Sequence, residues 1–383
     1  MRRYLTLLLS IFFGVLALIA AINVVVDPLN VYRVVSIPGV TSEKTRIHGT
    51  GMRIAKATAV EREKPETVIF GTSRAEVALD PFWDGFQGSV YNAALPDTNM
   101  VEIAAMVRHT LETAHPKTII FGLDLLAFSD EYAARHDFEW SPLSDRSAFD
   151  MHMKLLFSRK ITSLSFKTIS ENLRGRKAVY DARGGLFHLS FDDQGGHRAM
   201  FNSSLTPRSY ARFHYNQDRF ELFRDVVTEA VASGATVHLY ISPVHAWTVE
   251  AFSVLGLDAR FNQWKRDLTT LTADLSTQCP TGRDCIDLWD FSGFNSVTTE
   301  PVPPYGDTTR MLNYWENSHA TRRVGNWVLD RLFNRPTDAP IDFGTQLTPD
   351  TIDQRLAEQN GRQADFRTRF AGDLPDIRAR VTP

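Results

Sequence analysis

Residues 67–74 read TVIFGTSR, a short apolar run followed by a glycine and then a serine. Side chains of this kind, β-branched or aromatic, favour a buried strand, and Gly71 marks its end. The stretch therefore predicts a strand that delivers Ser73 to the edge of a sheet.

Outward from this stretch, short apolar runs alternate with residues at helical spacing. Strands are predicted at 89–91, 118–121, 236–241 and 286–288, and helices at 100–111, 220–230, 268–275 and 324–332. This alternation indicates an α/β fold with a doubly wound parallel sheet, covered by helices on both faces. In such sheets the active site lies beyond the carboxyl ends of the strands.

The composition excludes several classes of protein. The 383 residues include 42 Lys and Arg against 45 Asp and Glu, a formal net charge of −3 that argues against a nucleic-acid binder. A hydrophobic content of 43% excludes wholesale disorder. The histidines show no metal-ligand spacing, and no glycine-rich nucleotide loop follows a strand, so neither a metal nor a cofactor is expected.

The N-terminal segment has a different character. Residues 5–26 are 22 residues without a charge, and a helix of that length spans about 33 Å, enough to cross a bilayer. A cleaved signal peptide is the alternative, but cuts after Ala20 or Ala21 leave Leu18 or Ile19 where a small residue is needed. An uncleaved transmembrane anchor is therefore favoured.

The compartment follows from charge and cysteine usage. Arg2 and Arg3 precede the anchor, which places the N-terminus in the cytoplasm and the rest outside. Cys279 and Cys285 are the two cysteines, and the run CPTGRDC between them suits a small-loop disulfide in an oxidising compartment, with two free thiols as the alternative.

Five segments are expected along the chain. They are an anchor and exit at 1–33, a first part of the sheet domain at 34–128, a mostly helical insertion or lid at 129–215, a second part of the sheet domain at 216–335, and an amphipathic tail at 336–383. Within the insertion, residues 154–183 carry eight Lys and Arg against two acidic residues. That excess of positive charge fits contact with an anionic polymer or with lipid headgroups, and it fits equally a face that is simply exposed to solvent.

A second motif lies between the last predicted strand and the closing helix, where residues 313–319 read NYWENSH. Glu316, three residues before His319, can hold one nitrogen of the imidazole ring. The other nitrogen can then accept a proton from Ser73, which a doubly wound sheet brings to the same edge. Taken separately, Ser73 also fits a helix N-cap and Glu316–His319 an ordinary surface pair.

These motifs together resemble the SGNH (GDSL-like) hydrolase superfamily, whose sheet is flavodoxin-like. Three runs resemble, more narrowly, single-anchor envelope proteins that act beside membrane-bound O-acyltransferases in alginate O-acetylation and lipoteichoic acid D-alanylation. The runs are NVVVDPLNVY at 23–32, IFGTSRAEVALDP at 69–81 and YWENSHATRRVGNWVLDRLF at 314–333. The resemblance covers roughly residues 1–125 and 220–335.

The resemblance implies that Ser73 is the nucleophile and His319 the base, with Glu316 where the family usually has Asp. The oxyanion hole departs from the family pattern. Thr72 stands where the family has an Asp, and Asp124, when ionised, cannot donate the hydrogen bond of the family's Asn.

Three further residues are candidates for the pocket. Asn99 is a candidate oxyanion donor, beside the Ser73 backbone N–H. Arg74 is placed to contact an anionic substrate or to pair with a carboxylate. His245 follows a predicted strand and is placed to line the pocket or to serve the fold.

The expected protein is a single-pass protein of the bacterial inner membrane with a periplasmic domain. It would transfer an acetyl or short acyl group to an envelope polysaccharide through a Ser73 acyl-enzyme, with a membrane-bound O-acyltransferase as partner. The alternatives are an esterase with the same three residues and a non-catalytic scaffold that recruits the acyltransferase.

Overall fold

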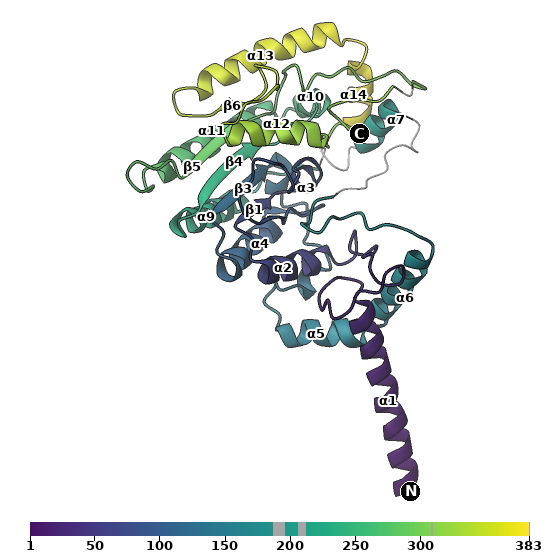
Figure 1. The fold of residues 1–383 in the computed structure, drawn as a ribbon. Helices are drawn as coiled ribbons and strands as arrows, with labels where there is room; N and C mark the ends of the chain where they lie inside the picture. Colours follow the sequence, from purple (N-terminus) through teal and green to yellow (C-terminus); the bar gives the residue numbers. More distant parts are fainter. Residues whose placement is uncertain (187–195, 206–211, 308, 383) are drawn as a thin grey trace. The chain divides into compact units, whose positions relative to one another are not determined.

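A computed structural model describes residues 1–186, 196–205, 212–307 and 309–382. The chain forms two compact units (Figure 1). The helical unit contains residues 1–63 and 135–181, and the sheet unit contains 64–134 and 182–383. The expected insertion at 129–215 is therefore divided between the two units.

The sheet unit is built on a six-stranded sheet in the order β2-β1-β3-β4-β5-β6. Its strands are β1 Thr67–Phe70, β2 Val90–Asn92, β3 Thr118–Leu123, β4 Thr236–Ile241, β5 Ile286–Asp290 and β6 Thr345–Gln346. The first five are parallel, and β6 pairs antiparallel with β5. The prediction of an α/β fold with a mainly parallel sheet is confirmed.

Helices follow most of these strands. They are α3 Ser73–Ala78, α4 Met100–Thr113, α7 His197–Ser204, α9 Gln217–Ala232, α10 Ala246–Val254, α11 Asp258–Ser276, α12 Arg322–Leu332, α13 Ile352–Arg369 and α14 Leu374–Val381, with a 3₁₀ turn, η1, at Leu125–Phe128. Helix α4 packs against α9, and α3 packs against α12. Between α11 and β5 the predicted Cys279–Cys285 disulfide is present.

The C-terminal segment 336–383 is an integral part of the sheet unit, since it supplies β6, α13 and α14. Asp290, fully buried at the end of β5, pairs with Lys265 at 2.9 Å and with Arg355 of α13 at 3.3 Å. Burial by itself raises the pKa of Asp290, but the charges of Lys265 and Arg355 hold it down to about 2. This ionic cluster fastens α13 to the sheet.

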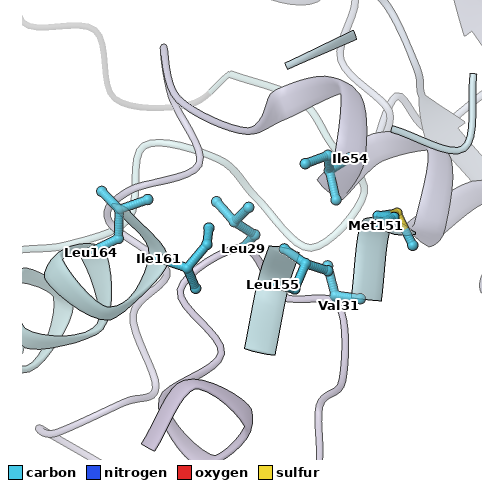
Figure 2. Packing of buried hydrophobic residues seen from close by; sticks show 7 residues of the cluster. All are labelled: Leu29, Val31, Ile54, Met151, Leu155, Ile161 and Leu164. Carbon is cyan, nitrogen blue, oxygen red and sulfur yellow. The ribbon is translucent and has the colours of Figure 1, made fainter. Parts of the chain in front are cut away.

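The helical unit contains α1 Arg2–Val26, α2 Met52–Glu63, the 3₁₀ turn η2 Phe138–Trp140, α5 Ala148–Phe157 and α6 Arg159–Leu173. Its core is the cluster in Figure 2, formed by Leu29, Val31, Ile54, Met151, Leu155, Ile161 and Leu164. Helix α1 is long and apolar enough to cross a membrane, as the sequence predicts for residues 5–26.

Close backbone contacts set the position of α3, which carries Ser73. Gly71 has a φ of +142°, and a Cβ there would lie 2.9 Å from the carbonyl oxygen of Gly122. Gly325 of α12 lies so near the end of α3 that a Cβ would be 1.8 Å from the carbonyl oxygen of Ala78. Only glycine lets these segments approach so closely.

Gly325→Ala is therefore expected to destabilise the sheet unit by about 1–3 kcal/mol, because the added methyl overlaps backbone that cannot move aside cheaply. Gly361→Ala in α13 is the matched control, since a Cβ there meets nothing within 4 Å. It should stabilise the protein by up to about 1 kcal/mol through helix propensity. Urea unfolding of the detergent-solubilised full chain measures both, and equal midpoints for the two variants would contradict the packing argument.

Candidate active site

Ser73 is the first residue of α3 and lies shortly after Phe70, where β1 ends. Thr72 is the N-cap of this helix, and its hydroxyl accepts a hydrogen bond from the Arg74 backbone N–H at 3.3 Å. The helix N-cap is therefore Thr72 and not Ser73, so the Ser73 side chain can make other contacts.

The Ser73 hydroxyl meets the imidazole of His319, with 2.8 Å between Oγ and Nε2, although 246 positions separate the two residues. The other ring nitrogen, Nδ1, is hydrogen-bonded to Oε1 of Glu316. In the tautomer that donates Nδ1–H to the carboxylate, Nε2 accepts the serine hydroxyl hydrogen. This is the order of groups that removes a proton from a nucleophilic serine.

Glu316 lies in a setting that keeps it ionised. Burial alone raises its pKa, but the charge and hydrogen bond of His319 lower it, as does the hydrogen bond from the Ser318 backbone N–H. The net effect is a lowered pKa. An anionic Glu316 can orient His319 and stabilise the imidazolium that forms when Ser73 gives up its proton.

The loop that carries Glu316 and His319 is closed by two backbone hydrogen bonds. The Trp315 N–H donates to the His319 carbonyl at 3.0 Å, and the Thr321 N–H donates to the Asn313 carbonyl at 2.8 Å. The loop therefore folds back on itself and presents His319 from a short, closed turn.

Asn317 attaches this loop to the start of α10. Its side chain is fully buried and donates to the Thr248 hydroxyl at 3.0 Å, while its backbone carbonyl accepts from that hydroxyl at 2.8 Å. The same carbonyl accepts the His245 backbone N–H at 3.1 Å.

His245 has a structural role. Its ring is buried, Nε2 donates to the Glu300 carbonyl at 2.8 Å, and Nδ1 accepts the Trp247 N–H at 3.2 Å as the N-cap of α10. Both nitrogens are thus occupied, which leaves neither for a substrate. Burial lowers the pKa of His245 to about 4, so the ring is neutral at neutral pH.

Arg74 and Asp124 form a pair beside Ser73. The guanidinium Nη1 lies 2.6 Å from Asp124 Oδ1, and Nε donates to Ser318 Oγ at 2.9 Å. Thr72 donates its hydroxyl to the other oxygen of Asp124. Of the two roles expected for Arg74, carboxylate pairing is the one seen, and Asp124 acts as an acceptor on both oxygens.

Asn99 is the N-cap of α4. Its Oδ1 accepts the backbone N–H groups of Val101 and Glu102, and its Nδ2 donates to the Tyr132 carbonyl. The side chain is committed to the helix start, a role that its position just before the apolar helical pattern already signals. This geometry gives no support to Asn99 as an oxyanion donor.

Sequence reasoning missed the contacts that surround the three central residues, namely Thr72–Asp124, Arg74–Ser318 and Asn317–Thr248. Over the described residues, no group of three His, Cys, Asp or Glu side chains is arranged to hold a metal ion. Comparison with models of known protein families and with curated protein sequences finds no match to this chain.

Stability should fall at mildly acidic pH because of His245. Its folded pKa of about 4 lies below the ordinary 6.5, so the unfolded chain binds the proton first as the pH falls. The stabilisation is complete above pH 6.5 and is lost as the pH approaches 4, amounting to about 3 kcal/mol.

His245→Asn tests this, since Asn is a good N-cap that does not titrate. It should be less stable than wild type at pH 7, because the Glu300 carbonyl loses its donor, and should lose less stability between pH 6.5 and 4. His115→Asn, at an exposed residue whose φ of +52° suits Asn, is the control and should keep the wild-type pH dependence. Urea midpoints across this pH range give the answer, and parallel curves for the three proteins would exclude His245 as the source.

Proposed function

We propose that this chain is a membrane-anchored acyltransferase of SGNH type, which moves an acetyl or other short acyl group to a cell-envelope polysaccharide. The observation that carries the proposal is the hydrogen-bonded series Ser73–His319–Glu316, in which a hydroxyl, an imidazole and a buried carboxylate follow one another. Serine-dependent acyl transfer uses these groups in this order.

The fold and the anchor support the same proposal. The parallel part of the sheet has the order β2-β1-β3-β4-β5, the order of flavodoxin-like doubly wound sheets, and Ser73 follows the carboxyl end of β1. The single apolar helix α1 and the Cys279–Cys285 disulfide fit a bacterial inner-membrane protein with a periplasmic domain.

The proposed reaction has two halves. Ser73 Oγ attacks the acyl carbonyl while His319 Nε2 takes the hydroxyl proton, and the tetrahedral intermediate expels the donor's leaving group with that proton. A sugar hydroxyl then attacks the Ser73 ester, His319 takes its proton and returns it to Ser73 Oγ, and the acylated polysaccharide departs. Glu316 stays anionic and stabilises the imidazolium in both halves.

Stabilisation of the oxyanion is assigned to the Ser73 backbone N–H at the start of α3 and to the positive charge of the neighbouring Arg74. The carboxylate at Asp124 replaces a neutral donor of the family pattern and offsets part of that charge. This departure is the specific observation that favours the rival proposal, in which the chain is a non-catalytic scaffold for a membrane-bound O-acyltransferase.

The chemical test is acylation of the purified full chain by an activated acyl ester, followed by mass spectrometry. One acyl group should appear on Ser73. Ser73→Ala should abolish the labelling, and His319→Ala should slow it by about 10⁴-fold or more, because residues of such a series act as a unit. Glu316→Gln should retain weak activity, and Ser276→Ala, at an exposed serine, should label as wild type does.

The acceptor distinguishes the enzymatic alternatives. Acylated polysaccharide as product supports transfer, whereas release of free acid without modified polymer supports an esterase. If Ser73→Ala and wild type behave alike with every ester, and Ser73→Ala also restores polymer acylation in cells, the scaffold proposal replaces the enzymatic one.

A further inference from the structure

The outer surface of α5 and α6 in the helical unit is unusual for a face in contact with water. Helix α5 has Met151 and Leu155 in the core shown in Figure 2. On its other side Phe149, Met153 and Phe157, spaced four residues apart, are 70%, 40% and 36% exposed. A helix that is apolar on opposite faces normally has both faces covered.

Helix α6 continues this surface and adds charge. Phe166 and Leu173 are 56% and 70% exposed. Arg159, Lys160 and Lys167 are exposed as well, and none of them forms an ion pair within the described part of the chain. Apolar side chains with adjacent unpaired cations are typical of elements that lie in the headgroup layer of a membrane.

The surface is fastened to the end of α1. Both helices pack against α1, as Figure 1 shows. Asn23 of α1 is buried, donates to the Leu156 carbonyl at 2.8 Å and to the Thr162 hydroxyl at 3.0 Å, and accepts from the Ser165 hydroxyl at 2.9 Å. The junction is therefore specific, and α5 and α6 have a defined height along α1.

If α1 spans a bilayer, this position along α1 coincides with the bilayer surface. The part of α1 that is almost wholly exposed, residues 4–18, is about 22 Å long, whereas the hydrocarbon core of a bilayer is about 30 Å thick. To cover that thickness, the turns of α1 that touch α5 and α6 must also enter the membrane boundary. Their exposed apolar side chains then meet lipid.

A groove of about 580 Å³ lies at this junction. Its lining includes Phe157, Phe166, Arg159, Lys167 and Ser163. Two aromatic rings and two cations in one groove suit a phospholipid, with an acyl chain along the rings and a phosphate at Arg159 and Lys167.

We propose that α5 and α6 form a lipid-docking surface, defined by Phe149, Met153, Phe157, Arg159, Lys160, Phe166, Lys167 and Leu173. This surface lies in the headgroup layer of the bilayer that α1 spans, and its cations bind anionic phospholipid. The inference rests on α1 being a membrane helix and is independent of the chemistry at Ser73.

The position of the surface is measured with a nitroxide on Ser163→Cys in the full chain, reconstituted into nanodiscs of phosphatidylethanolamine and phosphatidylglycerol. Both native cysteines are in the disulfide, so the label has one target. At Ser163, collisions with oxygen should exceed those with a water-soluble nickel chelate. A label on Glu61→Cys, exposed on α2, is the control and should show the reverse.

The charge component is measured with spin-labelled lipids and the variant Arg159→Gln/Lys160→Gln/Lys167→Gln. Its preference for phosphatidylglycerol over phosphatidylcholine should fall about fivefold for each cation removed. All three side chains are exposed, so the fold should persist, and a melting curve verifies this.

Three outcomes would overturn the inference. One is equal access of the nickel chelate to positions 163 and 61, which would mean that the surface is in water. Another is protection of position 163 from both reagents, which would mean that a protein covers the groove. The third is an unchanged lipid preference in the triple variant. None of these results would alter the acylation test at Ser73.

Discussion

The buried amide of Asn317 is the contact on which the geometry at the sheet edge depends. It joins the loop 313–321 to Thr248 and so to the start of α10, whose N-cap is His245. Leaving such a buried polar group without its partner costs about 1–3 kcal/mol, so the loop has one strongly preferred position. The position of the loop sets the position of His319, and therefore the distance between His319 and Ser73.

On the opposite side of the same edge, close backbone packing adds to the hydrogen bonds of Thr72 and Arg74. Gly71, Gly122 and Gly325 allow β1, β3, α3 and α12 to come closer than side chains would permit. Ser73 is therefore held by backbone packing together with the hydrogen bonds of its neighbours, whereas His319 is held by the polar network around Asn317. A site supported in these two ways can keep its groups in position without movement when a substrate arrives.

Much of the sheet was predictable because strands β1, β3, β4 and β5 are signalled locally, by apolar runs bounded by turn residues. Strand β6 has two residues and no pattern of its own; its place depends on distant contacts such as that between Asp290 and Arg355. The helical unit was not predictable either, since it forms only when residues 135–181 pack against residues 1–63.

At the site, the spacing of Glu316 and His319 and the position of Ser73 after a strand were sufficient to predict that the three residues lie together. The Arg74–Asp124 pair and the Asn317 network depend on side-chain directions across loops, which no local pattern encodes.

The junction at Asn23 also sets an order of events during synthesis. Asn23 is synthesised 133 residues before Leu156, which is the first of its partners along the chain. At about 5–20 residues per second, this interval is roughly 7–27 s. Throughout it, a polar amide near the end of an apolar helix has none of the partners that it has in the folded chain. If α1 spans a membrane, as proposed, Asn23 must therefore remain in the hydrated headgroup region, or α1 must be held by other proteins, until α5 and α6 have been made.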